Sequence, residues 1–255
     1  SVTGPDELFL RLFRETTFED LALFGELTFH INDDWRITGG ARAFRQEFTS
    51  FTFIDFPVFG FYPGDPLSSE DEGVLFKANI AGDLSDEAMV YATFSQGFRR
   101  GGANSIPTSG PLAEPLELVS YDPDRVNNYE LGLKGLLASG LRYSAAVYFV
   151  DWSDAQVGTL SPVFSFDVAV NAGDATSRGV ELELSGPITD QLSFAAGYAY
   201  TDAHLEEGFS GFVSGQPGAR LPGVSEHTFS GSLDYVIPVG GVMDLTLHAD
   251  GSYRS

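Results

Sequence analysis

The side chains with the clearest potential for binding chemistry flank one predicted connection between strands: Arg99, Arg100, Tyr121, Asp122, Asp124 and Arg125. A guanidinium group can bind a carboxylate or a phosphate through two parallel N–H donors. Arg99, Arg100, Tyr121 and Arg125 are therefore the predicted ligand-binding residues. The structural alternative, which is favoured, is that Arg125 pairs with Asp122 or Asp124 and braces the connection.

Carboxylates form a second group of interest. Phe51–Glu72 contains five acids and no Lys or Arg, and Gly158–Ala175 contains two acids and again no base. These segments could capture cations or bridge to lipopolysaccharide phosphates through divalent ions. The simpler interpretation, that they are solvated acidic loops, is favoured. The Asp-Pro-Asp of residues 122–124 alone is too small a ligand set for calcium.

Catalytic signatures are missing from the sequence. It contains no Gly-x-Ser-x-Gly, no His-Glu-x-x-His, no phosphate-cradling glycine loop and no dinucleotide fingerprint. It has no cysteine, and its four histidines are scattered: His30, His204, His227 and His248. We therefore expect neither an enzyme nor a cofactor, and the sequence leaves open whether a metal binds.

The composition narrows the class of protein. The 255 residues include 36 acids against 14 bases, which gives a net charge of −22 and argues against a nucleic-acid partner. An apolar fraction of 43% is too high for a disordered acidic chain. No apolar run is long enough for a transmembrane helix, but a membrane-spanning strand needs only about 9–11 residues with alternate apolar positions.

Alternation of apolar and polar residues is the dominant pattern, and it predicts strands. In Gln191–Thr201, apolar side chains at every second position (Leu192, Phe194, Ala196, Tyr198 and Tyr200) oppose small or polar ones. The same period recurs in Thr228–Ile237 and Met243–Arg254, around Val180–Leu184, and earlier in the chain around Leu21–Phe29, Phe76–Ile80 and Tyr129–Leu133.

Turn-forming sequences divide these strands into hairpins. Short turns are predicted to begin at intervals of about fifty residues, at Asn32, Leu84, Leu137, Ile188 and Pro238. Between them lie longer connections rich in Gly, Pro, Ser and Asp: Phe51–Glu72, Arg100–Asp124, Gly158–Ala175 and His204–Val224. The sequence thus predicts about ten antiparallel strands, with short turns at one end and long loops at the other. A partial further strand is predicted near Glu7–Glu15.

Three architectures share such alternation. A propeller blade has four short strands, and a soluble sandwich has strands of about 5–6 residues. Strands of ten or more residues with polar, small-residue faces fit a transmembrane β-barrel better, with an apolar exterior and a wet interior. Aromatic residues near the predicted strand ends agree with interfacial belts: Trp35, Tyr143, Tyr200, Phe229 and Tyr235. The predicted fold class is all-β, an antiparallel transmembrane β-barrel.

Several segments resemble the barrel of TonB-dependent outer-membrane receptors: Tyr91–Gly102 (YATFSQGFRRGG), Tyr121–Gly135 (YDPDRVNNYELGLKG), Tyr143–Val157, Asn171–Ala203, Arg220–Tyr235 and Ala22–Arg42. The resemblance runs from about Phe18 onward and lies in the order and spacing of these segments. It implies a 22-strand barrel that encloses an N-terminal plug. Residues 1–255 are then expected to be a fragment of the later part of the barrel domain, without the plug and the terminal strands.

The resemblance also implies a function. We expect a receptor in the outer membrane of a Gram-negative bacterium that takes up a scarce ligand, of the iron–siderophore type, with energy delivered by TonB. The implied partners are TonB, a small-molecule ligand of the metal-chelate type, and outer-membrane lipid with lipopolysaccharide. Two alternatives remain from the residues alone: a passive porin-type barrel and a soluble β-sheet binding module.

Overall fold

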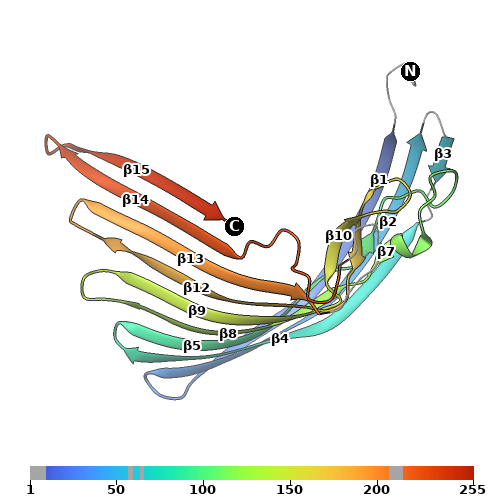
Figure 1. Cartoon of the computed structure of the whole chain (residues 1–255). Coiled ribbons are helices and arrows are strands. Elements are labelled where there is room, and N and C mark those ends of the chain that lie inside the picture. Colours follow the sequence, from blue (N-terminus) through green and yellow to red (C-terminus); the bar gives the residue numbers. More distant parts are fainter. Residues whose placement is uncertain (1–9, 57–59, 64–65, 207–214) are drawn as a thin grey trace.

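One curved antiparallel sheet dominates the computed structural model, which describes residues 10–56, 60–63, 66–206 and 215–255 (Figure 1). Its ten long strands pair in chain order. They are β1 (Arg11–His30), β2 (Trp35–Phe56), β4 (Leu67–Ser85), β5 (Ala88–Arg99), β8 (Asp124–Leu136), β9 (Arg142–Ser153), β12 (Ala175–Pro187), β13 (Leu192–Leu205), β14 (His227–Val239) and β15 (Met243–Arg254). Among the described residues, no helix is both long and apolar enough to cross a membrane. The predicted ten-stranded all-β organisation is confirmed.

Short elements occupy the connections at one end of the sheet. β3 (Gly60–Pro63) pairs with β2, β6 (Gly102–Ala103) pairs with β7 (Ser120–Tyr121), and β10 (Gln156–Leu160) pairs with β11 (Asp167–Asn171). A single 3₁₀ turn, η1, covers Leu116–Leu118. At the opposite end, five short turns join the long strands, as predicted.

Side chains and glycines fix these short turns. Asn32 Oδ1 accepts the backbone N–H groups of Asp34 and Trp35 at 3.0 and 2.7 Å, which closes the β1–β2 turn. Thr189 Oγ1 plays the same part before β13. Gly240 and Gly241 have φ of 64° and 70°, a conformation that favours glycine, and they form the β14–β15 turn.

Two sequence-based strand boundaries were wrong. Phe51–Glu72 is mostly strand rather than an irregular connection, because β2 runs to Phe56 and pairs with β4 up to Ser50↔Leu67. The separate partial strand near Glu7–Glu15 does not exist in the described residues, since Arg11 already belongs to β1; residues 7–9 lie outside them. The outer part of β2 is held by its buried inner face, described below, and β1 extends beside it through backbone pairing up to Arg11↔Asp55.

One face of the long strands is apolar and exposed. Ile37, Ile80, Leu131, Val147 and Val180 belong to one cross-strand row on this face. Farther along, Leu182, Leu233 and Leu245 are 44%, 48% and 50% exposed, so no protein interior covers them. We call this side the outer face.

The height of the apolar stretch agrees with a bilayer. On β1, alternate residues from Leu21 to Phe29 are apolar and exposed. That stretch is roughly 30 Å long at about 3.3 Å per residue. A strand tilt of about 40° reduces its height to roughly 23 Å, close to the ~25 Å apolar band of outer-membrane barrels.

The inner face, by contrast, is built from hydrogen-bonded polar side chains. Tyr91 Oη donates to Glu130 at 2.6 Å. Asn79 donates to Thr93 Oγ1 at 2.8 Å. Tyr148 and Thr201 share a hydroxyl hydrogen bond of 2.9 Å across β9 and β13. A dry core would not tolerate so many partly solvated polar groups, so this face suits an aqueous bore.

Aromatic rings of neighbouring strands lie close together, in tilted arrangements, on the outer face. Phe94, Tyr129 and Phe149 form one run across β5, β8 and β9, with ring centroids 5.2 and 6.4 Å apart. Tyr198, Phe229 and Tyr253 form a second run across β13 to β15, with centroids 4.7 and 6.3 Å apart. Such runs are typical of the aromatic girdle of a membrane barrel.

The sheet divides toward its loop end. β4 pairs with β5 only as far as Lys77↔Ser95, although β2–β4 and β5–β8 pairing continues beyond that point. Gln96 bridges the division, because its side-chain oxygen accepts the Phe76 N–H at 3.1 Å. Farther out, Phe98 stacks on Phe44 with ring centroids 4.1 Å apart. Since Phe98 lies on the outer face of β5 and Phe44 on the inner face of β2, the ends of β5 and β8 lie inside the β2–β4 ribbon.

Beyond this division the inner face of β2 becomes largely apolar. Four of its seven alternate side chains between residues 44 and 56 are apolar and buried: Phe44, Phe48, Ile54 and Phe56. Phe98 of β5 stacks on Phe44, and Phe164 and Phe166 contact Phe56. The outer face of the same segment carries charges instead, including Arg45, which pairs with Glu70 at 2.7 Å. In this part of β2 the inner face is therefore the buried one.

Opposite faces of β12 should respond differently to a charge. We expect Leu182→Arg to lower the free energy of unfolding of the full-length receptor by about 2–4 kcal/mol, because it places a guanidinium in hydrocarbon. Glu181→Arg, on the inner face, should cost much less. Denaturant titration in lipid vesicles measures both. An equal or larger cost for Glu181→Arg would show that the faces have been assigned the wrong way round.

Candidate functional site at the outer mouth

A buried carboxylate organises the loop end of β5 and β8. Asp124 is 1% exposed and accepts the Arg99 backbone N–H at 3.2 Å and the Gln156 backbone N–H at 3.0 Å. The Arg99 guanidinium grips the same carboxylate through Nε, at 2.9 and 3.2 Å, and through a further short contact from Nη2. It also lies over the Trp152 ring, 4.7 Å from the centroid. A fully hydrogen-bonded carboxylate of this kind fixes the strand ends.

Amide side chains extend the brace to the next loop. Gln156 donates to the carbonyls of Arg100 and Asp122, each at 2.9 Å. Asn171 donates to the Asp122 carbonyl at 3.0 Å, and its side-chain oxygen accepts the Asp122 N–H at 2.8 Å. The base of the β10–β11 hairpin is thereby joined to the β5–β8 connection.

Arg125 does not form the predicted brace. Its guanidinium contacts Asp71 of β4 at 3.5 Å, while Arg99 takes Asp124. A structural brace does exist at this connection, but Arg99 forms it and not the predicted Arg125. The reason is the division of the sheet, because Arg125 points from the outer face of β8 toward the inner face of the β2–β4 ribbon.

Arg100 and Tyr121 have different surroundings. The exposed Arg100 guanidinium lies over the Phe18 ring of β1, 4.2 Å from the centroid, and among the described residues no carboxylate pairs with it. The Tyr121 ring covers Gly102, its cross-strand partner, where a Cβ would lie 2.5 Å from the Tyr121 hydroxyl. Tyr121 therefore requires glycine at residue 102. Of the four predicted ligand-binding residues, the structure joins only Arg99 tightly to its neighbours.

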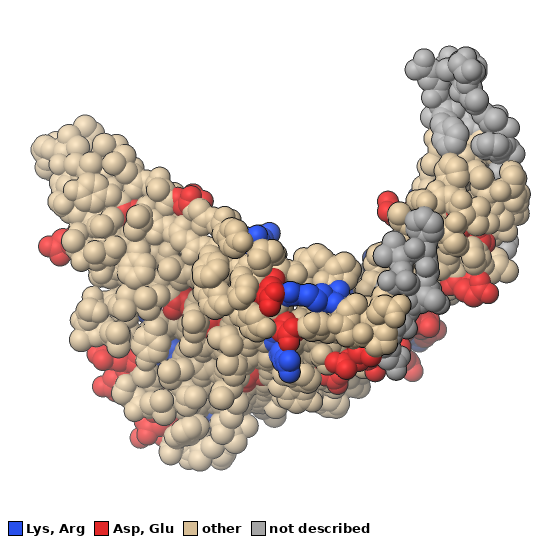
Figure 2. All heavy atoms as spheres, viewed as in Figure 1, with Lys and Arg blue, Asp and Glu red and all other residues tan. Residues whose placement is uncertain are grey.

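The acidic segments are less free than their sequence indicates. Glu70 and Asp71 pair with Arg45 and Arg125, which come from other strands, and Asp174 accepts the Asp154 N–H at 3.1 Å. Within the described ranges, no group of three or more His, Asp or Glu side chains is arranged to hold a metal ion. Acidic residues are scattered over the visible surface, and few basic residues accompany them (Figure 2).

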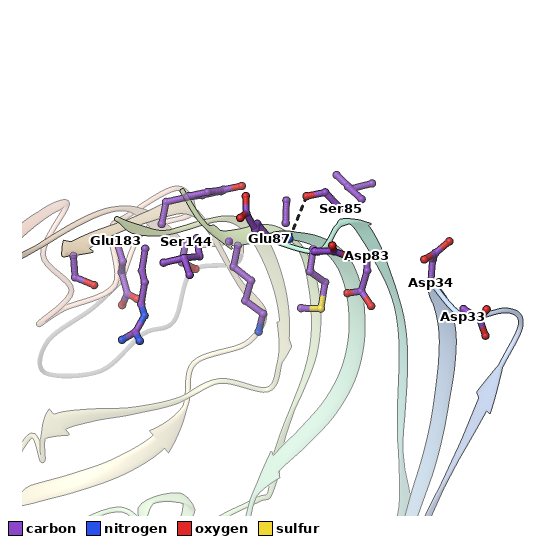
Figure 3. A pocket seen from close by; sticks show the side chains of 17 residues that line it. Asp33, Asp34, Asp83, Ser85, Glu87, Ser144 and Glu183 are labelled. Carbon is purple, nitrogen blue, oxygen red and sulfur yellow. Dashed lines mark hydrogen bonds between the residues drawn. The ribbon is translucent and has the colours of Figure 1, made fainter. Parts of the chain in front are cut away.

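A charged hollow of about 1040 Å³ lies at the other end of the sheet, among the short turns. Figure 3 shows side chains from several turns and strand ends around it, including Asp34, Asp83, Glu87 and Glu183. Ser85 Oγ accepts the Glu87 N–H there at 3.3 Å. Because this hollow lies at the end of the sheet far from the long loops, we do not assign ligand capture to it.

The fold and its loops define a class of protein. The chain matches the family model described as TonB dependent receptor-like, beta-barrel, over residues 2–255, and it belongs to that family. The family consists of outer-membrane transport receptors of Gram-negative bacteria rather than enzymes. This membership, together with the exposed apolar face, argues against the soluble β-sheet module considered from the sequence.

Among named relatives, the chain is 33% identical over 168 residues to the pesticin receptor of Yersinia enterocolitica, covering 66% of this chain and 24% of that receptor. It is 30% identical over 204 residues to the ferric-pyoverdine BN7/BN8 receptor of Pseudomonas putida, covering 73% of this chain and 22% of the relative. The chain thus spans about a quarter of the length of these relatives.

A solved structure shows the same fold. The ferric yersiniabactin uptake receptor FyuA from Yersinia pestis superposes with a TM-score of 0.74 at 24% identity, covering 95% of this chain and 35% of that one. The described sheet therefore corresponds to part of a larger barrel.

The brace can be tested by local proteolysis. Asp124→Asn places an amide where two backbone N–H groups and a guanidinium need an acceptor, at a cost of about 1–3 kcal/mol. We expect faster trypsin cleavage after Arg99 and Arg100 in intact cells. The control is Asp122→Asn, an exposed neighbour, which should leave the rate unchanged. Equal rates in the two variants would contradict the brace.

Proposed function

We propose that the whole receptor containing this barrel segment actively imports a scarce metal chelate, of the ferric-siderophore type, with energy supplied through TonB. The match to the family over residues 2–255 is the observation that carries this proposal. The printed names of the relatives include receptors for ferric pyoverdine, and the solved structures include a ferric yersiniabactin uptake receptor. In this proposal the barrel segment catalyses no reaction, and it forms part of the barrel wall and of its outer opening.

The unpaired edges of the sheet support a larger assembly. β1 and β15 are the two ends of the strand order, and ten long strands are fewer than the 22 of a plugged transporter barrel. Lipid does not tolerate exposed strand edges, so further strands must pair with both. We propose that a plug domain and these strands complete the receptor, and that TonB acts through the plug. Membrane lipid would cover the outer face, and lipopolysaccharide its charged rim.

Arg100 is the best-placed ligand contact of the four predicted. Its guanidinium faces the inner wall at Phe18 and has no carboxylate partner among the described residues, so it is available for an anionic group of a chelate. Tyr121 and Arg125 border the same mouth. Arg99 would act mainly by holding the strand ends.

Uptake measurements test the energy source. Cells that carry the complete gene should accumulate ⁵⁵Fe supplied as ferric yersiniabactin or ferric pyoverdine, and deletion of tonB should abolish that uptake. A passive barrel would conduct equally with and without TonB. Uptake of neither chelate, or uptake that survives the deletion, would refute active import of this ligand class.

Binding measurements test the Arg100 assignment. Because a hydrogen bond to a charged group contributes about 1.5–3 kcal/mol, Arg100→Ala should weaken binding of the imported chelate roughly ten- to a hundredfold. Arg100→Lys keeps the charge and should recover part of the affinity. Arg45→Ala, which removes an outer-face arginine, is the matched control. Equal affinities for Arg100→Ala and Arg45→Ala would exclude Arg100 as a contact.

A further inference from the structure

The β10–β11 hairpin spans the concave side of the sheet. The hairpin leaves the sheet between β9 and β12 (Figure 1). The rings at its tip nevertheless reach β2, which is four strands beyond β9 in the strand order. Phe164 and Phe166 lie 6.1 and 6.5 Å from the ring of Phe56, which is fully buried. Three strands, β4, β5 and β8, separate the hairpin from β2 in the strand order. A direct contact past these strands is short enough only across the concave side of the sheet, so the hairpin crosses the mouth.

A single carboxylate holds the tip of this hairpin. Glu114, in the β5–β8 connection, is 4% exposed. Its Oε1 accepts the Ser161 hydroxyl at 2.6 Å and the Phe164 N–H at 2.8 Å, and its Oε2 accepts the Val163 N–H at 3.1 Å. The tip turn thus wraps around the carboxylate as a nest of donors.

The geometry of the tip depends on this carboxylate. Ser161 is itself fully buried, and its hydroxyl oxygen accepts the Phe166 N–H at 2.9 Å, so one chain of hydrogen bonds runs from Glu114 to the ring that contacts Phe56. Among the described residues no cation pairs with Glu114, and donors of the tip alone compensate its burial. Removal of the carboxylate would leave buried donors unpaired.

The backbone on the other side of the contact is fixed as well. The Glu114 N–H donates to the Pro107 carbonyl at 2.8 Å. Nearby, Asn104 donates to the carbonyls of Leu118 and Ala169 and accepts the Ala169 N–H at 2.9 Å, which joins the connection to β11. The connection and the hairpin are therefore linked at base, middle and tip, and the tip link is made by Glu114.

We propose that Glu114 is a positioning residue that latches the β10–β11 hairpin as a strap across the mouth. With the latch closed, Phe164 and Phe166 stay on Phe56 and narrow the entrance that the proposed function assigns to the chelate. With the latch released, the tip leaves β2 while Gln156 and Asn171 still hold the base of the hairpin. The role of the strap in chelate entry rests on the proposed function, whereas the closed latch is argued from the hydrogen bonds of Glu114 and the ring contacts of Phe56.

Hydrogen–deuterium exchange in the purified full-length receptor, without any chelate, tests the latch. In Glu114→Ala the Val163 and Phe164 amides lose their acceptor. The Phe166 amide keeps the Ser161 hydroxyl as its acceptor, but that hydroxyl has lost its own hydrogen bond to Glu114. Exchange of these three amides should therefore become about tenfold faster or more. Peptides from β13 should exchange as in the unaltered receptor. Glu114→Gln, which keeps one acceptor oxygen, should give a smaller increase and serves if the alanine variant fails to fold.

Glu117→Ala is the matched control, because Glu117 is an exposed acid in the same connection. It should leave tip exchange unchanged. Unaltered tip exchange in both Glu114 variants would overturn the latch, and so would an increase that extends equally to β13, since Glu114 would then support the whole fold. A receptor that imports no chelate but shows the local increase would refute the proposed function while the latch stands.

Discussion

The hydrogen-bonding demand of the main chain in hydrocarbon is the constraint on which the rest of this structure depends. No water reaches a lipid-embedded strand, so every N–H and C=O group within the bilayer must pair with a neighbouring strand. The antiparallel ladder from β1 to β15 meets that demand except at its two edges and where β4 and β5 separate past Lys77↔Ser95. Strict alternation follows, because each strand then has one side toward lipid and the other toward the bore.

Outside the bilayer the constraint is lifted, and the chain uses ordinary soluble packing. There the inner side of β2 carries Phe44, Phe48, Ile54 and Phe56, which the loops bury. There buried carboxylates, rather than sheet pairing, hold the segments together: Asp124 accepts hydrogen bonds from residues of β5 and β10, and Glu114 accepts them from the hairpin tip. The outer mouth is thus a small globular assembly mounted on a membrane wall.

The sequence predicted the part of the fold that the bilayer dictates. Alternation around Leu182 and Leu233 correctly identified strands and their lipid side, and turn residues such as Asn32 correctly located the hairpins. Prediction from the sequence failed where tertiary contacts determine the structure. The extension of β2 to Phe56 depends on rings from a loop a hundred residues later, and the partner of Arg125 depends on the division between β4 and β5. Glu114 gave no local signal, because an isolated acid in a Pro-rich stretch looks solvated.

The end of β4–β5 pairing at Lys77↔Ser95 has a consequence for how such a receptor diversifies. Past that point the β2–β4 and β5–β8 strand pairs contact each other through side chains and not through a shared backbone ladder. Insertions or deletions near the outer end of either strand pair change the shape of the vestibule without shifting the register between β4 and β5 on the turn side of Lys77↔Ser95. New specificities can therefore be explored at the rim while the membrane anchor stays intact.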